Sequence, residues 1–513
     1  MLIMKCGIKN KFEKVWVSRE SELTEIRPSK VYNVFRKIFL AVFILTLFFI
    51  LFSNYIEVGG VTIAMVILLC FIGFLFYRYD APHFSLFLFL STLLITVFIS
   101  LVIDTPIVND FGVQYEAAQS FAKGDFSFGE DGYFQSFPFQ TGLAIVEGLL
   151  LKIWNNPMII RLMNCVLTAG INVLIYLIAA EFFSQKSSQI VAVFHLFFLF
   201  PTVYVTVLNN QIFSTFFFYL GLYLLIAKRF QSIKPVLKYL LAGIFWAIGN
   251  AVRPEGIIFL VSSGAYLFFG LFRQFSLENF KRFLKRSLAL FGSYFLITLL
   301  ISQTIIWTGV SSAGLENRAT LWKFVVGTNY NTSGGVNNHD TGLIEERMEQ
   351  YGYTRSEAEI SIIKDRVFIS PIRLMELAKK KTEVFWWDSN RNGAELLDWP
   401  LSNHLKEKYP LAIEWAVQMT RNMLVYIFIL AFLGTFKLLF RKGKKDTSLK
   451  SYLIPFLIFT TFVVYLAIEV QPRYSYIIHP AVFILAAGGV QYIYNFISRT
   501  TKGEGSKIKK DID

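Results

Sequence analysis

Charged residues are scarce in this sequence, and their scarcity excludes a soluble protein. Of 513 residues only 17% are charged, whereas 54% are hydrophobic and 17% are aromatic. A soluble domain carries about 25% charged residues, so the composition predicts an all-α polytopic membrane protein whose core is a helix bundle in the bilayer. The net charge of +14 does not indicate nucleic acid, because the basic residues cluster in short loops between apolar runs.

Cysteine and nucleotide-binding motifs are also rare or missing. Cys6, Cys70 and Cys165 lie far apart, without the spacing of a metal site or a redox pair, so we expect three inert thiols. The sequence shows no phosphate-binding glycine loop, no Walker motif and no internal repeat. We therefore expect no metal and no cofactor. Residues 1–34 are too polar for a cleavable signal peptide, so the first apolar run is expected to act as an uncleaved anchor.

Long apolar runs recur along the chain. A membrane span needs about 20 apolar residues, or about 17 when it is short. Twelve segments meet this requirement, namely 37–53, 60–77, 84–103, 158–183, 190–207, 212–227, 236–252, 257–272, 287–307, 413–436, 452–470 and 476–497. They divide the chain into a tail (1–36), spans one to nine (37–307), a loop domain (308–412), spans ten to twelve (413–497) and a basic tail (498–513).

The distribution of Lys and Arg predicts which side of the membrane each loop faces. With the N-terminus inside, the loops that face the cytoplasm hold most of the short-loop cations, and the short outer turns hold almost none apart from Arg253 and Arg473. Both termini are therefore expected in the cytoplasm. Segment 138–154 is apolar but short and carries Glu147, so we interpret it as an interfacial or re-entrant helix on the outer side. Regions 104–157 and 308–412 then face outward.

The first outer region contains a short amphipathic helix. From Gly112 to Lys123, Tyr115 and Ala118 fall on an apolar face, and Gly124 is well placed to end the helix. Asp110 precedes its first turn. A carboxylate in this position can be interpreted in two ways. It is either an N-cap that satisfies free backbone N–H groups or a functional group.

These motifs resemble the GT-C superfamily of membrane glycosyltransferases, in particular the branch that uses polyprenyl-phosphate sugars, such as protein mannosyltransferases and aminoarabinose transferases. The matching residues of the first outer loop are Asp110, Tyr115, Ala118, Gly124, Tyr133 and Pro138, and Arg161 and Asn164 follow at the start of the next span. Segments 198–225, 249–256 ("GNAVRPEG"), 322–337 and 469–480 ("EVQPRYSYIIHP") resemble later parts of the family in order. The chain departs from the family pattern at Phe111, where a second acidic residue is common, and in its first two spans.

The resemblance implies a site at the outer membrane boundary. Asp110 would be the general base that takes the proton of the acceptor hydroxyl. Arg253 and Arg473 would bind the departing phosphate, because the planar guanidinium matches phosphate oxygens. Arg161, Tyr115 and Tyr474 would be further substrate-binding residues.

Each of these assignments has an alternative. The arginines of the outer turns also fit the lipid headgroups, to which long cationic side chains extend. Asp104 is an alternative base, and His479 is expected to be a packed histidine rather than a catalyst.

The second outer region is expected to be a loop over 327–342, followed by two helices in 356–387 that separate near Pro371. We expect Trp386 and Trp387 to anchor at the membrane interface. His339 and Asp340 in the loop are expected to face a substrate or an ion, although two residues do not define a metal site.

The expected function is transfer of a hexose or pentose from a polyprenyl-phosphate donor to a glycan or other extracytoplasmic acceptor, with a cell-wall or surface polysaccharide as the favoured acceptor. The expected location is the cell membrane, with an extracytoplasmic active site. Two alternatives remain open. A flippase or transporter would place ionisable residues such as Glu181 and His195 deep in spans, and a polysaccharide polymerase would share the outer arginines without needing an acidic first loop.

Overall fold

The computed structural model describes residues 29–53, 60–78, 81–318, 321–387, 407–440 and 452–510. Cys6, most of the expected N-terminal tail, the end of the expected loop domain (388–406) and the basic loop 441–451 lie outside these ranges. The described residues form helices and no strand, and several of the helices are long and apolar. The chain is an all-α polytopic membrane protein, as the composition predicts.

Seven helices are long and apolar enough to cross a membrane. They are α2 (Lys30–Phe52), α4 (Phe84–Val102), α8 (Met158–Phe182), α12 (Pro235–Val252), α14 (Leu277–Trp307), α21 (Pro410–Phe440) and α23 (His479–Lys510). Four further apolar helices occupy predicted spans, namely α3 (Gly60–Arg78), α11 (Gln211–Ile226), α13 (Gly256–Leu271) and α22 (Leu453–Ala467). Eleven of the twelve predicted spans thus correspond to single helices.

The predicted span 190–207 is two helices instead of one. Helix α9 (Gln185–Leu196) begins at Ser184, whose side chain accepts a hydrogen bond from the backbone N–H of Ser187. Helix α10 (Leu199–Tyr204) follows after a break at Phe197 and Phe198. A further short helix, η3 (Lys228–Phe230), lies in a basic loop.

The last two long helices pack with very close backbones. An added Cβ at Gly489 of α23 would lie 2.1 Å from the carbonyl oxygen of Leu430 in α21, so only glycine fits there. Small residues allow this approach between membrane helices, and the contact gains van der Waals energy. The packing fixes the start of α23, and with it the turn that precedes this helix.

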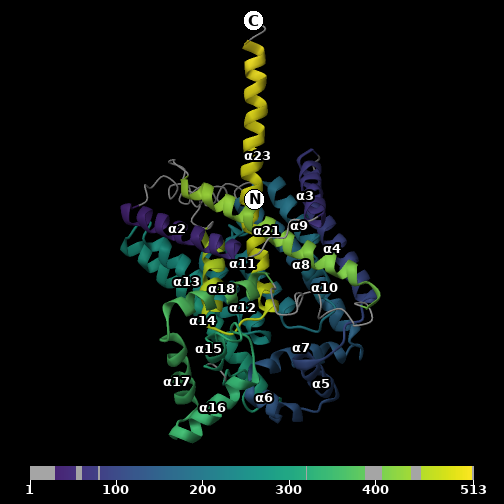
Figure 1. The fold of residues 1–513 in the computed structure, drawn as a ribbon, viewed down its shortest axis with the longest axis vertical. Coiled ribbons are helices and arrows are strands. Elements are labelled where there is room, and N and C mark those ends of the chain that lie inside the picture. Colours follow the sequence, from purple (N-terminus) through teal and green to yellow (C-terminus); the bar gives the residue numbers. More distant parts are fainter. Residues whose placement is uncertain are drawn as a thin grey trace, which may run out of the picture.

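The two predicted outer regions lie together at one end of the molecule, and the C-terminal part of α23 extends from the opposite end (Figure 1). The first region consists of α5 (Asn109–Lys123), η1 (Ser127–Glu130), α6 (Gly132–Ser136), η2 (Pro138–Gln140) and α7 (Thr141–Leu151). The second consists of α15 (Trp322–Gly327), α16 (Asn338–Tyr351), α17 (Arg355–Val367) and α18 (Pro371–Trp387). The break before Pro371 is where the sequence predicts it.

Helix α7 is too short to cross a bilayer, which needs about 20 residues. It packs on α5, and Glu147 on α7 is fully buried. Helix α5 starts three residues earlier than the periodicity indicates, and Gly124 ends it with a φ of +83°, a conformation that glycine adopts without steric cost.

The two tryptophans at the end of α18 do not lie on a lipid-facing surface. Trp386 and Trp387 are 2% and 1% exposed and pack against Phe428 of α21. The indole N–H of Trp387 donates to the carbonyl oxygen of Ile50 and to the hydroxyl of Ser53, at the end of α2. The expectation of interface anchors is wrong, because these rings join the outer region to the helix bundle.

Candidate functional site

Three chain segments that are far apart in sequence meet around one cavity at this end of the molecule. The cavity has a volume of about 770 Å³, and its lining includes Asp110 at the start of α5, Arg253 after α12 and Tyr474 in η5 (Pro472–Ile477). Arg473 of the same turn reaches Asp110. Three of the six residues proposed from the sequence therefore line the cavity, and a fourth, Arg473, contacts the lining residue Asp110 without being part of the lining itself.

Asp110 is the accessible carboxylate of this group. Its Oδ2 lies 3.4 Å from a terminal nitrogen of Arg473, and its side chain is 52% exposed. The N-cap residue is Val108, whose side chain makes no capping hydrogen bond. Asp110 lies two residues after it, so it is not the N-cap considered above. Asn109 before it has a φ of +56°, a left-handed conformation that asparagine tolerates better than most residues.

Arg473 is held by an aromatic ring and by Asp110. Its guanidinium carbon lies 5.2 Å from the centre of the Phe111 ring, within the range of a cation–π contact. The residue that departs from the family pattern therefore packs against this arginine. The Arg473 side chain is 11% exposed, so the cation stands at the cavity with little access to bulk water.

Arg253 belongs to a buried ion pair. One terminal nitrogen lies 2.6 Å from Oε1 of Glu255, and the other donates to Oδ1 of Asn210 at 3.0 Å. Its guanidinium also lies 4.7 Å from the centre of the Tyr474 ring. Burial lowers the pKa of Arg253, but the Glu255 carboxylate together with Tyr465 and Tyr474 raises it by more, so the guanidinium remains charged. Much of its charge is already balanced.

A third carboxylate, Glu469, stands beside the same turn. It accepts hydrogen bonds from the phenol of Tyr474 and the amide of Gln471, both at 2.7 Å. Lys323 of α15 also lines the cavity, and its ammonium lies 5.4 Å from the centre of the Phe139 ring. Burial lowers the pKa of Lys323, and Glu469 opposes that shift. Lys323 is a cation that the sequence reasoning missed.

Tyr133 supplies a neutral hydroxyl to the lining. Burial is the main cause that raises its pKa, and the negative charge of Asp110 adds to it, so the phenol remains protonated. Gln114 donates to its oxygen at 3.2 Å, which leaves the phenol hydrogen for another acceptor.

The cavity combines an apolar side with a polar rim. Ile257, Ile258, Val464 and Ile468 line one part of it, and Ile257 is exposed at the surface of the helix bundle. Gln135, Arg318 and Trp322 from the two outer regions line another part. Such a cavity can accept a molecule with both a greasy chain and a polar head.

The outer region holds the Arg473 turn in place through its backbone. The N–H groups of Glu469 and Val470 donate to the carbonyl oxygens of Lys323 and Gly334, at 2.7 and 3.0 Å. Lys381 of α18 donates to the carbonyls of Gly327, Leu466 and Ile468, all within 2.8 Å. Burial lowers the pKa of Lys381 to about 7, and Glu469 opposes that shift.

The other two proposed residues are not part of the cavity lining. Arg161 is buried, lies 3.3 Å from Asp104 and donates to the carbonyl oxygen of Thr105. It therefore ties the start of α8 to the segment that precedes α5. Tyr115 packs with Ala118 and Leu151 where α5 meets α7. Both side chains are engaged in packing that the sequence could not reveal.

Several residues outside the proposed site have structural roles. His479 is buried against Phe198 and Phe200, which confirms the expectation of a packed histidine. Asp340 is fully buried, and Arg366 and Asn329 bind its carboxylate. Glu181, considered for a transporter, lies 3.9 Å from Lys228.

Glu255, Tyr465 and Glu469 were missed by the sequence reasoning. The phenol of Tyr465 donates to Glu255 at 2.6 Å, so one carboxylate binds a tyrosine and an arginine. The signal was present, since both glutamates stand beside the arginine-bearing turns in "RPEG" and "EVQPR". Within the described ranges no three His, Cys, Asp or Glu side chains gather as a metal site would require.

The fold and the cavity together define a polytopic membrane protein with a charged cavity where the turns of its helices meet. No family model matches the sequence, and no curated protein matches it. Matches among solved structures include the oligosaccharyltransferase of Archaeoglobus fulgidus in the apo form, at 13% identity and a TM-score of 0.44, over 82% of this chain and 52% of that one.

A second match is archaeal oligosaccharyltransferase AglB from the same organism, in complex with an inhibitory peptide and a dolichol-phosphate. It has 13% identity and a TM-score of 0.44, over 83% of this chain and 52% of that one. The chain thus spans about half the length of the structures it matches. The function proposed next rests on the residues of this chain.

Proposed function

We propose that the chain is a GT-C-type glycosyltransferase that moves a sugar from a polyprenyl-phosphate donor to an extracytoplasmic acceptor. The observation that carries the proposal is a cavity lined by Asp110 and Arg253, with Arg473 in contact with Asp110, so that three distant chain segments bring these charges together. A carboxylate beside guanidinium groups is the arrangement that such a transfer needs, because a proton must be accepted where a phosphate departs.

The donor would lie with its polyprenyl chain toward the bilayer along the apolar side of the cavity, at Ile257, Ile258 and Val464. Its phosphate would lie at Arg473, whose contact with Asp110 is long at 3.4 Å, and at Lys323 of the lining, rather than at Arg253, which Glu255 holds at 2.6 Å. Arg253 would act as a second phosphate contact and as a support for Tyr474.

In the reaction, a carboxylate oxygen of Asp110 takes the proton of the acceptor hydroxyl. The hydroxyl oxygen then forms a bond to the anomeric carbon of the sugar, and the bond from that carbon to the phosphate oxygen breaks. Polyprenyl phosphate leaves with the electron pair, and its charge is stabilised by guanidinium and ammonium groups. Phosphate at Arg473 would take the place of Asp110 on that guanidinium and free the carboxylate to accept the proton.

In the proposed orientation both termini lie in the cytoplasm and the cavity faces outward. The proposed acceptor is then a cell-wall or surface polysaccharide. The basic loops and the nearly cation-free outer turns support this orientation. Introduced cysteines test it in cells, because a membrane-impermeant maleimide reaches only the outer side. A cysteine at exposed Ser356 should be labelled and one at exposed Lys281 should not; the reverse pattern would exclude an outer active site.

The transfer itself is tested with the purified chain in liposomes. Undecaprenyl phosphate that carries a radiolabelled hexose or pentose is supplied with a cell-envelope glycan fraction as acceptor. Label should enter the glycan only when the chain is present. Two results together would refute the proposal. They are the absence of transfer from any lipid-linked sugar and binding of undecaprenyl phosphate that is no tighter than binding of undecaprenol.

A further inference from the structure

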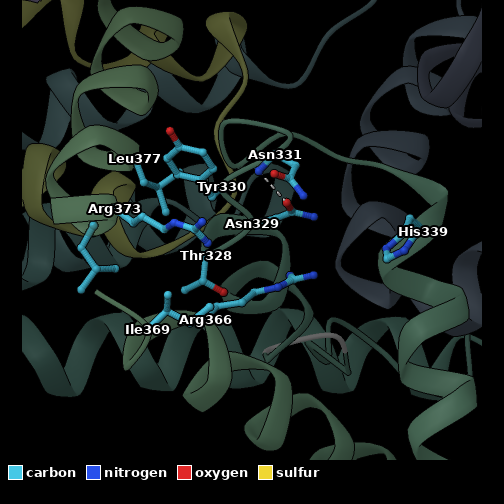
Figure 2. A pocket seen from close by; sticks show the side chains of 10 residues that line it. Thr328, Asn329, Tyr330, Asn331, His339, Arg366, Ile369, Arg373 and Leu377 are labelled. Atoms are coloured by element: carbon cyan, nitrogen blue, oxygen red, sulfur yellow. Dashed lines mark hydrogen bonds between the residues drawn. The ribbon is translucent and has the colours of Figure 1, made fainter. Parts of the chain in front are cut away.

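A second pocket lies within the outer helices, apart from the cavity described above. It has a volume of about 230 Å³ and is formed by the loop after α15 together with α17 and α18. Figure 2 shows the guanidinium of Arg373 turned toward Thr328 and Tyr330, with Arg366 and Asn329 beside them and His339 approaching from α16.

The charge around this pocket is positive. The Arg366 charge is balanced by Asp340, whose Oδ1 lies 2.5 Å away. Arg373 makes no salt bridge with any residue that the structure describes, and Lys380 reaches only the Tyr330 ring, at 3.8 Å from its centre. Both cations contact the ring of Tyr330, and the phenol of that residue donates a hydrogen bond to one carboxylate, that of Glu376, at 2.6 Å. Two cations against one carboxylate leave an excess of positive charge.

The rest of the lining fits a sugar. Thr328 and Asn329 offer hydroxyl and amide groups, while Ile369, Leu374 and Leu377 form an apolar side. Sugars present hydroxyl groups at their edge and C–H groups on their faces, so they need both kinds of contact. Pockets for drug-sized ligands occupy about 300–1,000 Å³. The smaller volume here suits one sugar unit rather than an oligosaccharide.

The pocket is a neighbour of the main cavity. His339 of α16 lines the pocket, and Thr341, two residues further along the same helix, lines the cavity. A glycan longer than one unit can therefore contact both sites across the start of α16.

We propose that this pocket binds an anionic sugar unit of the acceptor glycan, with Arg373 and Lys380 on its carboxylate or phosphate group. The assignment of the ligand to the acceptor rests on the proposed glycosyl transfer, whereas the preference for an anionic sugar rests on the pocket alone. Hydrogen bonds to a charged group contribute about 1.5–3 kcal/mol, so loss of one cation should weaken binding by about tenfold or more.

Titration calorimetry on the full, detergent-solubilised chain tests the proposal with three probes: trigalacturonate, 6-phosphomaltotriose and unmodified maltotriose. At least one anionic trisaccharide should bind at least tenfold more tightly than maltotriose, and the tighter of the two identifies carboxylate or phosphate as the preferred group. Arg373→Ala and Lys380→Ala should each weaken that binding about tenfold. Equal binding of maltotriose, or unchanged binding by Arg373→Ala, would overturn the proposal.

Two further variants separate the possible failures. Neither Lys379 nor Lys380 is in the pocket lining, but the Lys380 ammonium lies 3.8 Å from the centre of the Tyr330 ring, which does line it, whereas Lys379 pairs with Glu383 at 3.7 Å. Lys379→Ala should therefore bind the anionic probe like wild type. Asp110→Asn should also keep this binding, because Asp110 lines only the other cavity. Probe binding without sugar transfer by wild type would refute the proposed enzyme and leave the anion-selective pocket in place.

Discussion

Replacement of Asp110 by asparagine separates a catalytic carboxylate from a structural one. The structure predicts a small effect on stability, because the contact with Arg473 is long, at 3.4 Å, and the side chain is 52% exposed. The carboxylate end of this pair is exposed, where an ion pair contributes about 0–1 kcal/mol, and asparagine keeps an oxygen that can accept from the partly buried Arg473. The effect on chemistry should be far larger, since a general base contributes about 10²–10⁴ in rate, equivalent to about 2.7–5.5 kcal/mol of activation free energy.

Asp104→Asn is a closely matched control. Asp104 also pairs with an arginine, at 3.3 Å, and its side chain is 98% exposed, but it is outside the cavity lining. Initial rates of transfer from radiolabelled undecaprenyl-phosphate sugar, with the donor saturating, should fall about 10²–10⁴-fold for Asp110→Asn and remain near wild type for Asp104→Asn. Thermal melting in detergent should shift little for either variant. A near wild-type rate for Asp110→Asn, or a large loss for Asp104→Asn, would refute the assignment of the base.

Three other predictions concern the charges around the cavity. Arg473→Ala should slow turnover about 10²–10³-fold when the lipid donor is saturating, the loss typical when one hydrogen-bond donor to a developing anion is removed. Arg473→Lys should recover part of the rate. A change in affinity for the lipid donor alone would argue against stabilisation of the leaving phosphate. Glu255→Ala should lower the free energy of unfolding by about 3–5 kcal/mol, because Arg253 stays buried without its partner. Glu316→Ala, which breaks an exposed pair with Arg318, should cost about 1 kcal/mol or less; equal melting temperatures for these two variants would contradict the distinction. Burial lowers the pKa of Lys381 to about 7, below its unfolded value of about 10.4. The unfolded chain therefore binds more protons between these values, and stability rises with pH over that window, by up to about 1.4 kcal/mol per unit. The melting temperature of wild type relative to Lys381→Met should rise from pH 7 to pH 9, and a flat difference would refute the shift.

The cavity also shows why turn residues were easier to predict than their partners. Arg253 and Arg473 stand out in the sequence because a cation in a tight outer turn is rare among membrane proteins. Nothing in the letters indicates that Glu255 balances the charge of Arg253 while Arg473 faces Asp110. That difference arises from which side chains the turns bring together. The sequence predicts the same role for the two arginines, whereas the structure gives them different partners.

The sequence by itself determined the features that depend on local chemistry. Apolar runs predict helices for the bilayer, Gly124 ends α5, and the segment before Pro371 ends α17. These features follow from hydrophobicity and backbone conformation over a few consecutive residues, so the letters suffice.

Only the tertiary structure decided which side chains share a cavity. It placed Arg161 against Asp104, packed Tyr115 under α7, and buried Trp386 and Trp387 in the bundle. It also brought Lys323 and Glu469 to the same cavity as Asp110. Such contacts join residues tens to hundreds of positions apart, and they depend on the close packing of whole helices, which no short stretch of sequence records.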